Sequence, residues 1–371
     1  MVFSILPTFL TEVLGASKKA FGFVEGIAIA LSFVAKMMAG IGSDLMKKRK
    51  PIILLGNILT VICKVTFAFS TTVFHVFTAR IMDRFVRGIR SAPTDALIAD
   101  LTPREHQGAS FGFRQSLYVA GSVVGGILAY IILKSSNNDF YLLFRLAVIP
   151  TLIALWIFSR FIHEGEIKAP KGKSWSISDI SLLSADFWIL IIATFALMLA
   201  RFSTGFLNIR ARELGISVHA IPLLIIAYEF AQAVIAWPIG SLADRFSKKY
   251  LLFGGILILT ITNAVIVFVA SEMSIILGMI LAGIHMGCTQ GLLSTLIAQS
   301  APPHIRGTAF AIYYACVGSA VMFGNSFAGW VSDVFNTSVA AFVGGMFFTS
   351  ISLLIICLYK GTDHYATQRG A

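Results

Sequence analysis

The sequence predicts an all-α, polytopic membrane protein built from two similar helical halves, and three observations carry this prediction. Only 13% of the 371 residues are charged, whereas a soluble domain carries about 25%. The apolar residues fall into blocks of about 20, the length that crosses roughly 30 Å of hydrocarbon as a helix. Two loop patterns also recur 200 and 199 positions apart, which indicates duplication.

Eleven blocks are long enough to span a membrane completely. They cover residues 20–41, 51–71, 73–99, 108–133, 140–162, 185–206, 218–240, 250–270, 274–299, 307–331 and 338–359. The apolar stretch 1–10 precedes them, and at 1.5 Å per residue it reaches about half way across. We therefore expect a truncated first span, and a natural sequence that extends upstream of Met1.

The longest polar stretch, 163–184, is rich in Pro, Gly, Lys and Ser. This composition is typical of a linker. It predicts an N-terminal bundle over 1–162, a cytoplasmic linker over 163–184, a C-terminal bundle over 185–359 and a cytoplasmic tail over 360–371.

The net charge of +11 lies largely in short loops between apolar blocks, so it indicates membrane topology and not nucleic-acid binding. The loops 41–51, 160–184 and 240–250 are richest in Lys and Arg, which predicts that they are cytoplasmic. We expect a monomer in a bacterial inner (plasma) membrane, with lipid and a small solute as partners. The four cysteines show neither disulfide nor zinc spacing. No metal and no cofactor are expected.

The repeated patterns are short but specific. Gly40-Ile41-Gly42-Ser43-Asp44 precedes the basic run 47–50, and 200 positions later Gly240-Ser241-Leu242-Ala243-Asp244-Arg245 precedes Lys248-Lys249. The segment from Pro103 to Phe111 likewise matches Pro302 to Phe310 at an offset of 199. Because the matched loops are expected on one side of the membrane, the halves are parallel repeats.

These loops resemble the major facilitator superfamily signature G-x-L-a-D-R-x-G-R/K-R/K. The matching residues are Gly40, Asp44, Lys48 and Arg49 in the first copy, and Gly240, Asp244, Arg245, Lys248 and Lys249 in the second. Leu45, Lys47 and Ser247 depart from it, while 84–92 is similar to the family's R-x-x-q-G-x-g-x-a. The resemblance covers essentially the whole chain. It implies two pseudo-symmetric six-helix bundles, alternating access, and a gating role for these cytoplasmic residues.

One departure concerns drug export. Family exporters that exchange drugs for protons often carry G-x-x-x-G-P-x-x-G-G in the fifth span. Here Gly121 and Gly125 match, but Gly126 stands where the proline would be. The departure weakens a drug-exporter interpretation without removing it.

The span 73–99 carries the strongest polar signal. Arg80, Asp83, Arg84 and Arg87 follow the i, i+3, i+4, i+7 spacing of one helical face. Each such charge costs about 2.5–3.5 kcal/mol at mid-membrane on insertion scales, so the face is expected to meet protein or a water-filled cavity. It forms either a wall that holds an anionic group or a structural ion-pair network, with Asp83 paired to Arg80 or Arg87.

Five further residues are candidates for the substrate or proton pathway. Glu229 lies at the centre of its span and suits proton coupling, or a hydrogen bond between helices. Glu25 is either interfacial or at the cavity mouth. Arg201, like Lys64, lies in the outer third of its span, where snorkelling is the default. His285 and Gln290 either contact substrate or hydrogen-bond between helices.

These observations predict a secondary active transporter, coupled to protons, for an anionic or zwitterionic metabolite or siderophore, or for a drug. The alternatives are a non-transporting membrane receptor or scaffold with the same fold, and an intramembrane enzyme. No Walker A loop, H-E-x-x-H motif or comparable catalytic cluster occurs. We therefore expect no enzymatic activity.

Overall fold

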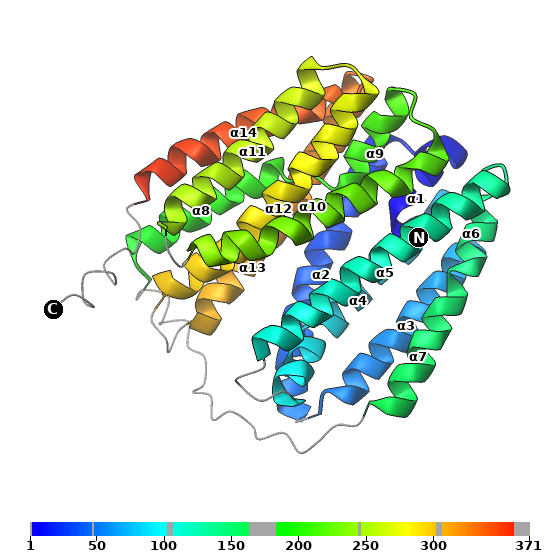
Figure 1. The fold of residues 1–371 in the computed structure, drawn as a ribbon, viewed down its shortest axis with the longest axis horizontal. Helices are drawn as coiled ribbons and strands as arrows, with labels where there is room; N and C mark the ends of the chain where they lie inside the picture. The colour runs from blue at the N-terminus through cyan, green and yellow to red at the C-terminus, as the bar shows by residue number, and fades with distance from the viewer. Residues whose placement is uncertain are drawn as a thin grey trace. The chain divides into compact units, whose positions relative to one another are not determined.

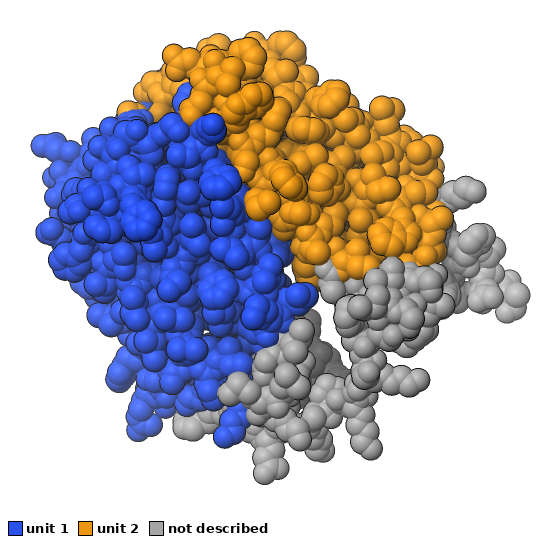
Figure 2. Space-filling view, turned by 180° about the vertical axis from the view of Figure 1, so that it is seen from behind, with its two compact units in different colours: residues 1–172, 216–223 blue, residues 173–215, 224–371 orange. Residues whose placement is uncertain are grey.

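The computed structural model describes residues 2–46, 48–101, 107–162, 183–243, 246–301 and 306–359, and every regular element within these ranges is a helix (Figure 1). The chain divides into two compact units (Figure 2). Unit 1 holds residues 1–172 and 216–223, and unit 2 holds 173–215 and 224–371. Most of the predicted linker and the whole predicted tail lie outside the described residues, so these boundaries stay predictions.

Unit 1 is built around α4. Its helices are α1 (Val2–Thr8), α2 (Lys18–Met46), α3 (Lys50–Ala68), α4 (Val73–Leu101), α5 (Gln107–Ser135), α6 (Phe140–Leu146) and α7 (Val148–Phe161), with a π-helical turn η1 (Phe9–Val13) after α1. Helix α4 packs against both α2 and α3, and α3 also packs against α6 and α7. Charged side chains on α4 therefore meet protein on two sides.

Unit 2 contains α8 (Ala185–Ala200), α9 (Thr204–Glu213), α10 (Ile221–Ala243), α11 (Lys248–Phe268), α12 (Glu272–Ser300), α13 (Arg306–Val334) and α14 (Val339–Leu358). The first three residues of α10, and the 3₁₀ turn η4 (Val218–Ala220) before it, belong to unit 1. Helix α8 packs against α13 and α14, and α11 packs against α12 and α14.

The same close helix crossing occurs in both units. A Cβ on Gly88 of α4 would lie 2.3 Å from the carbonyl oxygen of Ser32 on α2. A Cβ on Gly287 of α12 would lie 2.7 Å from the carbonyl oxygen of Gln232 on α10. The two glycines are 199 positions apart and their partners are 200 apart. Small residues let helix backbones approach closely, and here the duplication has kept them at matching positions.

Two spans that were predicted as single helices are interrupted. The predicted span 140–162 breaks at Ala147, because Pro150 has no N–H to donate to the carbonyl of Leu146 and its ring clashes there. The predicted span 185–206 breaks between Ala200 and Thr204. The next subsection describes how that break is held.

Nine helical segments of the described chain are long and apolar enough to cross a membrane, with α6 and α7 counted as one segment and α8 and α9 as another. Neither α4 nor α13 is among them, since α4 carries the charged face and α13 is rich in glycine, serine and tyrosine. The short first span is a helix that continues through Val13 as a π-helical turn. The number of spans therefore stays a prediction.

Candidate functional site

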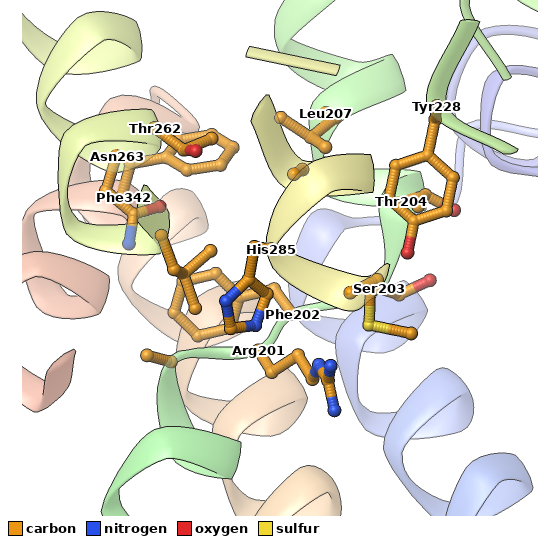
Figure 3. Close-up of a pocket in the computed structure, with 14 residues that line it drawn as sticks. Arg201, Phe202, Ser203, Thr204, Leu207, Tyr228, Thr262, Asn263, His285 and Phe342 are labelled. Carbon is orange, nitrogen blue, oxygen red and sulfur yellow. The ribbon is translucent and has the colours of Figure 1, made fainter. Parts of the chain in front are cut away.

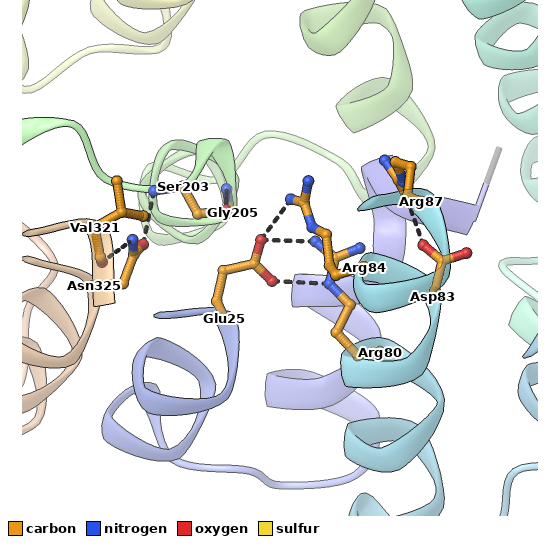
Figure 4. Close-up of polar contacts among 9 residues, drawn as sticks. All are labelled: Glu25, Arg80, Asp83, Arg84, Arg87, Ser203, Gly205, Val321 and Asn325. Atoms are coloured by element: carbon orange, nitrogen blue, oxygen red, sulfur yellow. Dashed lines mark hydrogen bonds and ion pairs between the residues drawn. The ribbon is translucent and has the colours of Figure 1, made fainter. Parts of the chain in front are cut away.

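Glu25 on α2 is the centre of the first charged cluster in unit 1 (Figure 4). Its side chain has no exposed surface and accepts hydrogen bonds from Arg80 Nε at 2.8 Å and Arg80 Nη2 at 2.7 Å. Arg84 Nη2 donates to the same carboxylate at 2.8 Å. Bidentate arginine contacts of this kind are the strong form of an ion pair. Glu25 is therefore a buried partner of α4.

Asp83 is the centre of the second charged cluster. It accepts from Lys64 Nζ on α3 at 2.9 Å and pairs with Arg87 one turn further along α4. The predicted pairing of Asp83 with Arg87 is confirmed. Lys64 joins two helices instead of extending to the membrane interface, so the snorkelling expectation for it is wrong.

The predicted charged face of α4 thus serves two neighbours. Arg80 and Arg84 bind Glu25 of α2, while Asp83 pairs with Lys64 of α3 and with Arg87. Through the described contacts, each cluster joins two cations to one carboxylate. The side chain of Arg84 is 18% exposed and that of Arg87 40%, against 5% for Arg80. The accessible members of both clusters are cationic.

Unit 2 contains a cavity at the break between α8 and α9 (Figure 3). Its empty volume is about 440 Å³, including space open to the surface. The walls come from the break itself and from four other helices. The lining residues are Ala200, Arg201, Phe202, Ser203, Thr204, Leu207, Tyr228, Leu259, Thr262, Asn263, Ala282, His285, Met286 and Phe342.

The break is held by side chains that replace lost helical hydrogen bonds. Ser203 N–H donates to Asn325 Oδ1 at 2.8 Å, and Asn325 Nδ2 donates to the carbonyl of Val321 at 2.8 Å (Figure 4). Ser203 Oγ in turn accepts from Gly205 N–H at 3.3 Å as the N-cap of α9. Irregular backbone at membrane depth requires such partners, and the break places Arg201 in the cavity wall.

Arg201 supplies the positive charge of this cavity. Its Nη2 donates to Thr289 Oγ1 at 2.9 Å, and its Nη1 lies 3.6 Å from the sulfur of Met198. Its buried Nε has no hydrogen-bond partner in the described ranges. No described carboxylate forms an ion pair with it, and none lines the cavity.

His285 and Asn263 add polar atoms to the same cavity. Both are buried, with 1% and 2% exposure. His285 Nδ1 lies 2.8 Å from the carbonyl oxygen of Gly255 on α11, which can only accept, so Nδ1 carries the proton of this bond. His285 Nε2 and Asn263 Nδ2 have no hydrogen-bond partner in the part of the chain that the structure describes. The helix–helix hydrogen bond expected as the alternative for His285 is present, and the ring also faces the cavity.

Glu229 and Gln290 lie outside the cavity lining. Glu229 is half-buried on α10, next to the lining residue Tyr228. Gln290 is exposed on α12 and accepts from Gln232 Nε2 of α10 at 3.2 Å. The structure therefore brings Arg201 and His285 together but leaves these two candidates apart from them.

The residues of the two loop signatures are only partly described. Gly40 and Asp44 lie in α2, whose side chains are not described there, and Gly240 lies in α10. Asp244 and Arg245 fall outside the described residues. Lys48 is exposed and Arg49 is buried.

A matching lysine contact follows this signature in each unit and was missed from the sequence. Lys50 Nζ at the start of α3 donates to the carbonyl of Ser159 near the end of α7 at 3.3 Å. Lys249 Nζ, beside Lys248 at the start of α11, donates to the carbonyl of Cys357 at the end of α14 at 2.9 Å. Cations are favoured at helix C-termini, and the 199-residue spacing of these lysines was the available signal.

The family model described as Major Facilitator Superfamily matches residues 1–208 and again 190–370. The chain belongs to this superfamily. It is accordingly a multi-pass integral membrane protein of a transporter family, and two successive matches fit the repeated halves. The resemblance found in the loop signatures is confirmed.

Several characterised and uncharacterised proteins are similar along most of their length. An uncharacterized MFS-type transporter of Methanocaldococcus jannaschii is 26% identical over 89% of this chain and 84% of its own. A multi-drug resistance efflux pump PmrA homolog of Lactococcus lactis is 22% identical over 95% and 89%. A crystal structure of a nucleoside transporter NupG mutant matches with a TM-score of 0.77 at 14% identity, covering 96% of this chain and 94% of that one. This last likeness shows the fold alone.

Proposed function

We propose that this superfamily member is a proton-coupled secondary active transporter that moves a small anionic solute by alternating access. The observation that carries the proposal is the guanidinium of Arg201, which lies in the cavity wall without an ion pair to a described carboxylate. Arg84 and Arg87 add cationic surface on α4, where their side chains are 18% and 40% exposed. Buried charge is costly without a partner, so an anionic substrate would complete the balance at Arg201.

Proton coupling requires a carboxylate whose charge depends on its neighbours. Glu25, held by Arg80 and Arg84, is the leading group. Arg84 is the more exposed of the two arginines, so a substrate anion that engages Arg84 competes with Glu25. Loss of one cationic partner then favours the neutral, protonated form of Glu25. Asp83 and Glu229 are the other carboxylates proposed for the pathway.

The proposed orientation follows the basic loops. The signature loops and the C-terminal tail face the cytoplasm of a bacterial cell, because loops rich in Lys and Arg stay on that side. Asp44 and Asp244, with the neighbouring basic residues, are proposed to hold the halves in one state on this side. The protein acts as a monomer, since each half supplies one bundle.

Counterflow in proteoliposomes tests transport directly. Vesicles that contain the full chain and a candidate anion should accumulate the labelled anion from outside. A pH gradient with the acidic side outside should increase the uptake. Glu25→Gln, Asp83→Asn and Glu229→Gln are compared in the same assay. If all three keep the full pH response, proton coupling through these carboxylates is wrong. Absence of counterflow for every anion would favour the receptor or scaffold alternative.

Drug export is the second candidate function. It is favoured by the name of the Lactococcus lactis relative, a multi-drug resistance efflux pump homolog, and opposed by Gly126 in place of the exporter proline. Expression in a drug-sensitive host separates the two. Export predicts raised resistance to hydrophobic cations, whereas the anion proposal predicts none.

A further inference from the structure

We propose that the cavity of unit 2 binds a monoanionic acid that carries a hydroxyl or amide donor beside its anionic group. The inference deepens the proposed function and rests on it for the anionic class of substrate. It adds the position of the charge, the need for a second polar group, and the exclusion of zwitterions.

Arg201 binds the anionic group. Its guanidinium presents an unused buried Nε, and its hydrogen bond to Thr289 fixes the direction of the planar head. Fork-shaped donors of this kind match the two oxygens of a carboxylate. The N-terminus of α9 begins at the cavity wall through Ser203 and Thr204. Ends of broken helices of this type favour anionic groups in transporters.

His285 binds the adjacent donor. Because its Nδ1–H is committed to the carbonyl of Gly255, the neutral ring presents Nε2 as an acceptor. That atom is buried and has no other partner among the described residues, so a ligand hydroxyl or amide N–H completes it. Asn263 Nδ2, also unused, supplies a donor on the same wall.

The remaining lining explains the rest of the ligand. Phe202, Leu207, Met286 and Phe342 are apolar wall residues and suit an apolar or aromatic body. No carboxylate lines the cavity. A zwitterion would therefore place its ammonium group beside Arg201 without a counter-ion, which disfavours binding.

Four nearly isosteric probes test these features on the purified full chain in detergent at pH 7. Mandelate has the carboxylate, the hydroxyl and an aromatic body. Phenylacetate lacks the hydroxyl, phenylglycine is a zwitterion, and mandelamide lacks the charge. Calorimetry or thermal shift should rank mandelate first, ahead of phenylacetate by about tenfold. Phenylglycine and mandelamide should be weaker than mandelate by about 10- to 100-fold.

Three variants locate the binding. Arg201→Gln should abolish the preference for mandelate over mandelamide, while Arg201→Lys should keep it in weaker form. Arg212→Gln is the matched control, because Arg212 lies on α9 outside the cavity lining. It should bind mandelate like the unchanged protein. If Arg201→Gln does not fold, the lysine variant and the ranking of the four probes still test the site. His285 is not substituted, because its ring also joins α11 to α12. The comparison of mandelate with phenylacetate tests its role instead.

Equal affinity for the four probes, or no mandelate binding at about 10 mM, overturns the inference. An unchanged ranking in Arg201→Gln overturns it as well. These outcomes differ from failure of the proposed function, because binding needs neither a gradient nor transport. Ranked binding without proton-driven flux refutes the transport mechanism and keeps the site. Proton-driven flux of an anion without any preference among the probes supports the transport mechanism and refutes the site.

Discussion

The two units use one packing scheme with different chemistry at its centre. Lys64 and Asp83 of unit 1 correspond, at the 199-residue offset, to Asn263 and Ala282 of unit 2. The first pair forms an ion pair at 2.9 Å between α3 and α4. The second pair, on α11 and α12, lines the cavity of unit 2. The space that ion-paired side chains occupy in unit 1 is lined by short, uncharged ones in unit 2.

The correspondence is independently supported by a nearby helix contact. A Cβ on Gly56 would lie 2.3 Å from Arg90 Cγ, and a Cβ on Gly255 would lie 2.7 Å from Thr289 Cγ2. Both members of each contact are 199 positions apart in sequence. The helix contacts recur in both units, while the polar residues between them differ. Duplication therefore conserved the helix packing, and the polar positions diverged to separate roles. Unit 1 holds these charges in ion-paired clusters between helices, and unit 2 holds Arg201 in a cavity.

The largest expected effect comes from removing the central carboxylate of unit 1. Glu25→Ala leaves the buried Arg80 and the partly exposed Arg84 without their counter-ion. Breaking a buried ion pair from one side costs about 3–5 kcal/mol. The yield of monodisperse protein and its apparent melting temperature in detergent should both fall strongly.

The matched control is Glu272→Gln, an exposed acid in the first turn of α12. It should change the melting temperature little. Equal behaviour of the two variants would mean that the Glu25 cluster contributes no more than an exposed acid, and would remove the contrast between paired and unpaired charge.

The shared helix crossing gives the next effect. Gly88→Ala and Gly287→Ala each place a methyl group against the backbone of the neighbouring helix, and overpacking of this kind costs about 1–3 kcal/mol. Both variants should lower the melting temperature by similar amounts. Gly254→Ala is the control, since its Cβ meets nothing within 4 Å and alanine is the better helix former. A loss in only one unit would show that the crossings are not equivalent.

A double substitution tests whether unit 2 accepts the chemistry of unit 1. Asn263→Lys and Ala282→Asp each bury a charge, and together they recreate the pair of Lys64 and Asp83. The coupling free energy from the double-mutant cycle should be favourable by about 0.5–3 kcal/mol. Side chains of this size also fill the cavity, so mandelate binding should be lost.

The control cycle combines Ala282→Asp with Ile261→Lys on the exposed side of α11. Its coupling should be close to zero, because the two side chains face different ways. Equal coupling in both cycles would mean that charge compensation is non-specific and would break the positional comparison.

The sequence predicted contacts within one helix better than contacts between helices. The i, i+4 spacing predicted the pair of Asp83 and Arg87, because both residues lie on one helix. Arg80 was also a possible partner of Asp83, yet it binds Glu25, 55 positions away. Helical periodicity fixes the face of a residue but not which neighbouring helix that face meets.

The helix breaks show the same limit from another side. Pro150 explains the break before α7 and is present in the sequence. The prediction followed the continuous apolar block 140–162 and missed it. The break before α9 depends on Asn325, which accepts from Ser203 N–H from 122 positions away. No local signal marks that contact, which holds the interrupted backbone that lines the cavity. The scaffold was therefore readable from the sequence, whereas the cavity depended on tertiary contacts.

The smallest effect concerns the lysines that follow the signature loops. Lys50→Met and Lys249→Met each remove a cation from the C-terminus of the last helix in their unit, worth about 0.3–1 kcal/mol. Both should lower the melting temperature slightly, more so at low salt because such contacts are screened. Lys134→Met is the control, since Lys134 donates to Tyr130 within its own helix and caps no other. Equal small shifts at Lys50 and Lys249, absent at Lys134, would make the capping contact a third feature that the duplication preserved. A shift in one unit alone would restrict the shared scaffold to the glycine contacts.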